Sequence, residues 1–273
     1  AITVLKTEKA LGEKVRFPTV TLREPEKEIV LHFTEGAEFP REVFIVVLDN
    51  AEVKTYEAIV SLNTESVIQY EEIVGAQPSI MPEEFIECED LVKANPDFLA
   101  ALKKRGIDNV DLVMVDPWSA GYFDIPENEG KRLARAICWV KKFPEDNGYA
   151  YPLTGIVVYV NLNSMEVDRV EDYGVREMPT VDGNYYPEVS DSIEFRTDWK
   201  PLEIIQPEGP SFTVEGNLIK WQKWSFRYGF NPREGLVLYT VNYNDDGKER
   251  PMFYRLSLSE MVVPYADPTF AHN

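Results

Sequence analysis

Histidine and cysteine are scarce in this chain, with two of each among 273 residues. Two cysteines are too few for a disulfide scaffold, so the core has to be stabilised by apolar burial. We expect Cys88, in a helical pattern, and Cys138, in an apolar strand, to be buried free thiols; a bridge between them is the alternative. Two histidines cannot form the ligand cluster of a transition-metal site. His32 alternates with Val30 and Thr34, which is typical of a strand face, so we expect no metal site in this chain.

Long apolar runs and positive charge are also scarce. The longest apolar runs, residues 44–48 and 156–160, are too short to cross a bilayer, and no charged-then-apolar leader precedes Leu5. We therefore expect a soluble chain without a membrane partner, located in the cytoplasm or the peroxisome. Its formal net charge of -19 opposes binding to nucleic acid, because nucleic acid is a polyanion. The same charge suits a cationic amine ligand, although solubility alone explains it equally well.

A helix followed by several strands is predicted for residues 1–80. Residues 1–12 have the apolar spacing of an amphipathic helix closed by Gly12. Strand patterns separated by Pro, Gly and Asp-Asn turn signals follow at residues 15–22, 28–33, 42–48, 53–60 and 67–73. This order predicts a small α+β domain.

The same order recurs in residues 81–178. A helix is predicted to begin at Pro82, to restart at Pro96 and to end at Gly106. Strand patterns then follow at residues 110–115, 132–141, 155–162 and 166–170. The sequence therefore predicts a second small α+β domain.

Local identities support a repeat at an offset of 100 residues. The run Val60-Ser61-Leu62-Asn63 matches Val160-Asn161-Leu162-Asn163, and Val67 matches Val167. These positions predict two hairpins with the same asparagine-led turn, although short hairpins also match by chance.

A linker and a run of short strands complete the chain. Residues 179–200 are rich in proline, glycine and acidic residues without apolar periodicity, which is typical of a linker. Strand patterns at residues 211–214, 218–226, 236–243 and 250–257 predict part of a β-sandwich or barrel. Residues 201–273 are too few to close a large one, so we expect further strands to cover the open edge.

Several motifs, in this order, resemble copper-containing amine oxidases. They are VRFPTVTLREPEK (15–27), GIDNVDLVMVDPWSAG (106–121), FPEDNGYAYPLTG (143–155), QPEGPSF (206–212), GFNPREGLVL (229–238) and SLSEMVVPYADP (257–268). The resemblance implies an α+β chain of two cystatin-like domains, each a helix on an antiparallel sheet, followed by the opening strands of the catalytic β-sandwich in residues 201–273.

The resemblance also implies an activity for the parent polypeptide. Such enzymes convert a primary amine, O2 and water to an aldehyde, ammonia and hydrogen peroxide, and use copper and topaquinone as homodimers. The family's catalytic aspartate, cofactor tyrosine and copper ligands lie beyond Asn273. We therefore expect this segment alone to bind neither copper nor quinone, and Asp267 of the YADP turn is not assigned as the base.

Five residues match functional positions of the family, one at the quinone and four in the amine channel. Tyr265 matches the tyrosine whose hydroxyl group hydrogen-bonds a quinone oxygen. The second small domain lines the amine channel from positions that match Phe85, Pro117, Trp118 and Tyr149. From position alone, Tyr265 would cap a strand and the other four would be core or surface residues. If Trp118 lines the channel, its size narrows the path and favours slim amines.

Two other functions are compatible with the residues. Two cystatin-like domains can form a non-catalytic binding or docking module, and the chain can also be half of an enzyme completed by a second chain. The sequence has no Gly-rich phosphate loop, nucleophile elbow or basic aromatic stripe, which argues against nucleotide, hydrolase and nucleic-acid functions.

Overall fold

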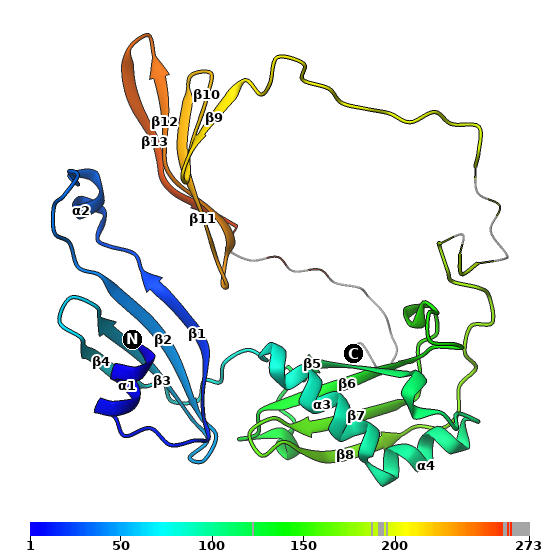
Figure 1. Cartoon of the computed structure of the whole chain (residues 1–273). Coiled ribbons are helices and arrows are strands. Elements are labelled where there is room, and N and C mark those ends of the chain that lie inside the picture. Colours follow the sequence, from blue (N-terminus) through cyan, green and yellow to red (C-terminus); the bar gives the residue numbers. More distant parts are fainter. Residues whose placement is uncertain are drawn as a thin grey trace.

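The computed structural model describes residues 1–121, 123–186, 188–190, 194, 196–258, 261 and 263. Within these residues the chain forms three antiparallel sheets, and Figure 1 shows them as separate units along the chain. Two sheets have four strands each and the third has five, and neighbouring strands always follow one another in sequence. The predicted α+β class is confirmed.

The first sheet carries one helix against it. Its elements are α1 (Ile2–Glu8), β1 (Val15–Arg23), α2 (Lys27–Leu31), β2 (Glu42–Asp49), β3 (Lys54–Ser61) and β4 (Ser66–Glu72). Val43, Ile45 and Val47 alternate along β2 and are buried in one cluster with Leu5 of α1. One face of the strand therefore packs against the helix, as the period of two residues in the sequence predicts.

The predicted strand at residues 28–33 is wrong, because this segment forms helix α2. The backbone N–H of Val30 donates to the carbonyl of Glu26, and that of His32 to Glu28, so the segment satisfies its polar groups locally. None of the α2 residues is buried, so no core contact enforces an extended conformation. His32 follows the helix, 2.8 Å from the Glu28 carbonyl oxygen through Nδ1, and does not lie on a strand face.

The second sheet has helices across one face (Figure 1). Its elements are α3 (Pro82–Ala94), α4 (Pro96–Lys104), β5 (Val113–Ser119), β6 (Leu133–Val140), β7 (Ile156–Asn161) and β8 (Glu166–Asp172), with short 3₁₀ turns at η1 (Val110–Leu112), η2 (Pro126–Asn128) and η3 (Gly148–Ala150). Asn95 caps α4 by accepting from the backbone N–H groups of Asp97 and Phe98. Phe98 and Val158 are fully buried in the core between helices and sheet.

Both cysteines lie in this core. Cys88 on α3 and Cys138 on β6 are buried and free, so the expectation of two free thiols is confirmed. Burial raises the pKa of the Cys88 thiol to about 12, and burial also raises the pKa of Cys138. Thiols held in the protonated form are poor nucleophiles and behave as small apolar side chains.

The matching hairpins of the first two sheets have the same register. Val60 pairs with Val67, and Val160 pairs with Val167. In both hairpins a register shift falls immediately before this pair. The sequence identities at an offset of 100 therefore correspond to equivalent backbone geometry.

The asparagine of each hairpin also has the same role. The side-chain oxygen of Asn63 accepts from the backbone N–H of Arg41, and that of Asn163 from the backbone N–H of Arg132. Each asparagine thus ties its turn to the start of a neighbouring strand segment.

The third sheet has one more hairpin than the sequence predicts. Its strands are β9 (Phe212–Glu215), β10 (Leu218–Trp221), β11 (Trp224–Asn231), β12 (Gly235–Asp245) and β13 (Lys248–Ser257). The single strand predicted for residues 218–226 is wrong, because Trp221 pairs with Trp224 across a tight turn. Gln222 in that turn has φ of 54°, a left-handed conformation that usually marks glycine or asparagine, so the turn signal is missing from the sequence.

Between β8 and β9 the described residues form no helix or strand, and Figure 1 shows this segment running to the third sheet. No helix in the described part of the chain is long and apolar enough to cross a membrane.

Candidate functional site

Tyr265 lies outside the described residues, so its role at a quinone remains a prediction. The other candidate residues belong to the second domain, around the edge strand β5. Among the described strands, β5 pairs with β6 on one side and lies at the edge of its sheet.

Alternation along β5 separates two groups of side chains. Val113 and Val115 are buried against the helices. Because successive strand residues face opposite sides, Met114, Asp116 and Trp118 face away from the helices. Trp118 is 45% exposed on this side.

The four predicted channel residues do not converge on one face of the sheet. Pro117 is buried and faces the helix side, and Phe85 is 42% exposed in the first turn of α3. Tyr149 is 58% exposed and lies on the opposite side, where its hydroxyl group contacts Asp116, which shares a strand face with Trp118. The structure therefore places these residues on both sides of the β5 edge.

Tyr149 is held over the outer face by two contacts. Its hydroxyl group donates to Oδ2 of Asp116 at 3.1 Å, and its ring lies edge-to-face with Trp139 at a centroid distance of 5.2 Å. Gly148 in the turn η3 leaves room for Met114, since a Cβ there would lie 2.3 Å from Sδ of Met114 and would displace that side chain. The hydrogen bond to Asp116 and the ring contact with Trp139 thus hold the Tyr149 side chain in place.

Asp116 is the residue of this group that sequence reasoning missed. Burial raises the pKa of its carboxyl group, the hydrogen bond from Tyr149 lowers it, and the charge of Glu89 raises it further. Burial and the nearby Asp116 charge in turn raise the pKa of Tyr149. Within the described residues no Lys or Arg lies within ion-pair distance of Asp116.

Acidic side chains elsewhere on the same sheet do have basic partners. Asp168 binds Lys131 and Arg169, and Asp172 binds Arg105 at 2.7 Å. The ion pair with Arg105 is the main cause that lowers the pKa of Asp172. Asp116 differs from these acids because, among the described residues, its side chain pairs with a neutral phenol.

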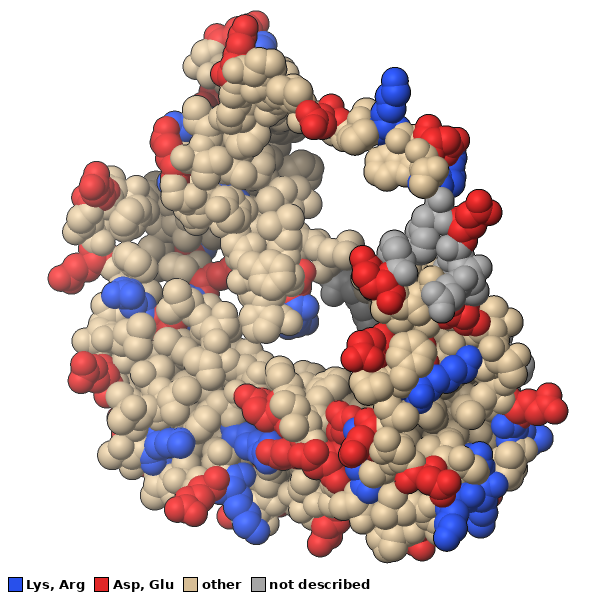
Figure 2. Space-filling model, turned by 45° about the vertical axis from the view of Figure 1, so that its right-hand side comes forward, with Lys and Arg blue, Asp and Glu red and all other residues tan. Residues whose placement is uncertain are grey.

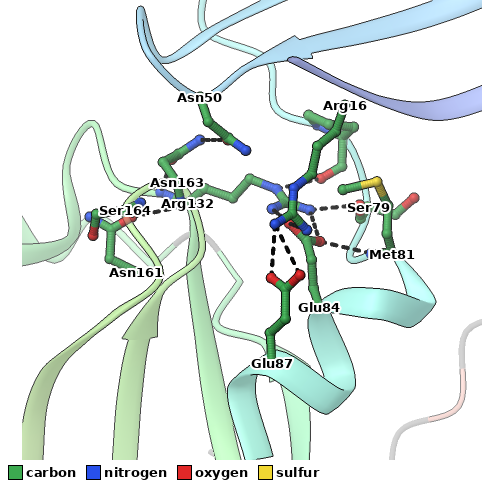
Figure 3. A network of polar contacts seen from close by, with 11 residues as sticks. Arg16, Asn50, Ser79, Met81, Glu84, Glu87, Arg132, Asn161, Asn163 and Ser164 are labelled. Atoms are coloured by element: carbon green, nitrogen blue, oxygen red, sulfur yellow. Dashed lines mark hydrogen bonds and ion pairs between the residues drawn. The ribbon is translucent and has the colours of Figure 1, made fainter. Parts of the chain in front are cut away.

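The junction of the two small domains is built on a buried ion pair (Figure 3). Arg132 donates to both carboxylate oxygens of Glu84, at 2.6 and 2.7 Å, and also to the backbone carbonyls of Pro78 and Ser79. Glu84 accepts from the backbone N–H of Met81. The pair thus fixes the segment that connects the first domain to α3.

Side chains of the first domain reach the same junction. Arg16 of β1 donates to Glu87 of α3 at 2.8 Å, and Asn163 donates to Asn50 at 3.1 Å. The two small domains are therefore connected by direct side-chain contacts between them (Figure 3).

A second ion cluster connects the first domain to the third sheet. Arg255 of β13 binds Glu24, next to the end of β1, and also Glu234. Tyr239 of β12 donates to Glu24 at 2.7 Å. Burial and this contact raise the pKa of Tyr239 to about 12.

The third sheet itself exposes large apolar side chains. Trp221 is 47% exposed, Phe230 83% and Phe253 49%. Figure 2 shows charged side chains interspersed over the two small domains and a broad area without them on the third unit. Exposed large apolar side chains on a surface with few charges are typical of an interaction surface.

The described residues do not provide a copper site. No group of three or more His, Cys, Asp or Glu side chains gathers within them. Within the part of the chain that the structure describes, no site fits copper, and we derive no chemical step through it.

Comparisons with known proteins match three successive parts of the chain. The AGAO-like N2 domain matches residues 1–70, the copper amine oxidase N3 domain residues 83–187, and the copper amine oxidase enzyme domain residues 213–273. A primary amine oxidase of Arthrobacter sp. (strain P1) is 45% identical over 268 residues, which cover 98% of this chain and 40% of that protein. A peroxisomal copper-containing diamine oxidase of Nicotiana tabacum is 38% identical over 296 residues, covering 94% of this chain and 38% of that protein.

A solved structure agrees with these matches. A copper-containing benzylamine oxidase from Hansenula polymorpha has a TM-score of 0.80 and 26% identity, covering 99% of this chain and 44% of that chain. The chain thus spans about two fifths of the length of the relatives that it matches. It belongs to the copper amine oxidase family, as the N2 and N3 domains and the beginning of the enzyme domain.

Proposed function

We propose that the polypeptide to which this chain belongs oxidises primary amines with O2 and water, giving an aldehyde, ammonia and hydrogen peroxide. The observation that carries this proposal is the 45% identity to a primary amine oxidase along 98% of the chain. Within that enzyme, residues 1–80 and 81–178 act as two small domains, 179–200 as a linker and 201–273 as the start of the catalytic sandwich.

The role of this chain is to form part of the path of the amine. Trp118 and Tyr149 present partly exposed rings on one side of β5, and Phe85 and Pro117 lie on its other side. An edge strand lined on both sides can form the rim of a passage that the rest of the enzyme completes. Tyr265 is proposed to donate a hydrogen bond to the quinone and to orient it.

Copper and topaquinone belong to the part of the polypeptide that follows this chain. Bound there, they supply the carbonyl and redox chemistry that amino-acid side chains lack. The exposed apolar side chains of the third sheet, such as Phe230, support its coverage by the remaining catalytic sandwich. We also propose a homodimer formed through that domain, in the cytoplasm or the peroxisome.

The test is to express the full-length polypeptide with copper and to measure peroxide, aldehyde and intact mass. We expect one peroxide per aldehyde from primary amines, and neither peroxide nor stoichiometric copper with the 273-residue chain alone. A folded, copper-loaded polypeptide that oxidises no primary amine would support a binding module instead. Activity that appears only after a separate catalytic chain is added would support a two-chain enzyme.

A further inference from the structure

An unneutralised carboxylate lies among aromatic rings on the outer face of β5. Asp116 accepts one hydrogen bond, from Tyr149, and no basic side chain of the described residues pairs with it. A partly buried carboxylate without a cation is costly, because burial disfavours the charged form. Tyr149 offsets only part of this cost, since a neutral phenol carries no positive charge. The group is thus suited to accept a cation from outside the chain.

The neighbouring rings suit the same kind of ligand. Trp118 lies two residues further along the same strand face and is 45% exposed, and Tyr149 is 58% exposed. Aromatic faces attract ammonium groups, and tryptophan does so most strongly. A carboxylate flanked by two such rings matches an alkylammonium ion: its charge contacts the carboxylate and its hydrocarbon part contacts the rings.

We propose that Asp116, Tyr149 and Trp118 form a site, here called the ammonium site, that binds the protonated amine before it reaches the quinone. This inference rests on the proposed function. A primary alkylamine has a pKa of about 10.4, as the lysine side chain has, so the substrate arrives at neutral pH as a cation. The ammonium site collects that cation, and Asp116 becomes a specificity-determining residue that favours charged amines over neutral molecules of the same shape.

The geometry also allows a purely positioning role for Asp116. In that case its carboxylate would serve only to hold the Tyr149 ring against Trp139. The two roles differ in what they need: the ammonium site needs the negative charge, whereas positioning needs only an acceptor for the phenol. Asp116→Asn separates them, because asparagine keeps the acceptor oxygen and removes the charge.

The experiment compares steady-state kinetics of the full-length, copper-loaded enzyme with those of Asp116→Asn, using benzylamine at several salt concentrations. We expect KM to rise about threefold to tenfold at low salt with kcat unchanged, and the decrease of kcat/KM with added salt to become shallower. Asp90→Asn is the matched control, since it removes one exposed acidic charge from α3 of the same domain. Tyr149→Phe keeps the charge and removes the hydrogen bond, so its salt dependence should stay that of the parent.

Binding of n-butylammonium to the same proteins, measured by calorimetry, gives a readout independent of turnover. Asp116→Asn should weaken it by a similar factor, and Asp90→Asn should not. Equal kinetics and binding for Asp116→Asn and Asp90→Asn would overturn the ammonium site, as would a loss in Asp116→Asn that Tyr149→Phe reproduces in full. A protein that binds n-butylammonium through Asp116 but oxidises no amine would contradict the proposed function and support the site.

Discussion

Trp118 lies on the edge strand β5, and its large side chain is 45% exposed. Truncating a fully buried tryptophan costs about 3–5 kcal/mol, so we expect Trp118→Ala to lower the free energy of unfolding by about half of that. Widening the path should raise kcat/KM for bulky arylalkylamines relative to methylamine by about tenfold. Urea unfolding and an amine series on the full-length enzyme measure both effects.

The matched control is Trp221→Ala, since Trp221 is 47% exposed on the third sheet. In the 273-residue chain it should lower the free energy of unfolding by a similar amount, and in the full-length enzyme it should leave the order of amine preference intact. If Trp118→Ala lost the full stability expected for a core tryptophan and kept the order of substrates, Trp118 would be a structural residue.

Tyr265 is proposed to contact the quinone through its hydroxyl group alone. Tyr265→Phe removes that hydrogen bond and keeps the ring, so we expect turnover of the full-length enzyme to fall by about ten- to a hundredfold, or about 1–3 kcal/mol. Stopped-flow absorbance of the quinone should show a slower reductive phase. Tyr254→Phe on β13 is the control, and amine kinetics in Tyr265→Phe equal to those of the control would refute the assignment.

Family motifs pointed to Trp118 and Tyr149 in the sequence but gave no reason to select Asp116, two residues before Trp118. Its significance depends on a partner 33 positions away in the chain, in a turn that folds back over β5. Charge alone does not mark such a residue, because the chain contains 47 acidic side chains. Which acidic side chain lacks a basic partner depends on contacts between segments that are distant in the sequence.

Among the elements, the strands with one buried face were predictable. Along β2, Val43, Ile45 and Val47 alternate with partly exposed residues, and the period in the sequence reports this directly. The wrongly predicted segment, residues 28–33, has similar apolar content but contacts no core, so local hydrogen bonds decide its conformation. The missed turn at Gln222 lacks the residue types that usually adopt its backbone angles.

The ion pair between Glu84 and Arg132 connects a helix to a strand at the domain junction. Glu84→Gln leaves the buried Arg132 charge without its partner, so we expect a loss of about 3–5 kcal/mol in the free energy of unfolding. The double variant Glu84→Met/Arg132→Met should lose less than Glu84→Gln, since no charge remains buried. Urea unfolding of the chain measures this, and a double-mutant cycle gives the coupling.

Asp198→Asn is the control for this pair. Asp198 binds Arg196 on the surface, with both side chains largely exposed. Removing that charge should leave the unfolding midpoint unchanged. Additive losses for Glu84 and Arg132 would show that the buried contact has no energetic role.

At the scale of the whole molecule, Glu24 connects the first domain to the third sheet across more than 200 residues of sequence. Glu24→Gln removes one of the two carboxylates that pair with Arg255, so the third sheet should detach from the first domain more often. We expect limited proteolysis to cut between β8 and β9 several times faster.

Glu26→Gln is the control, since it removes a neighbouring charge and should not change the cutting rate. Equal cutting rates in the two variants would show that the contact between Glu24 and Arg255 does not hold the third sheet.

The buried thiols Cys88 and Cys138 allow the opening of the second domain to be measured by chemical labelling. Thiolates, not thiols, react with iodoacetamide, and in the folded domain both groups are covered and the pKa of Cys88 is raised to about 12. Alkylation should therefore occur only during transient opening of this domain, and its rate reports the opening equilibrium without signal from other domains. Peptide mass spectrometry distinguishes the sites, and both should be labelled at the same rate if helix and sheet open together. Rapid labelling of Cys88 alone would instead show that α3 separates from an intact sheet.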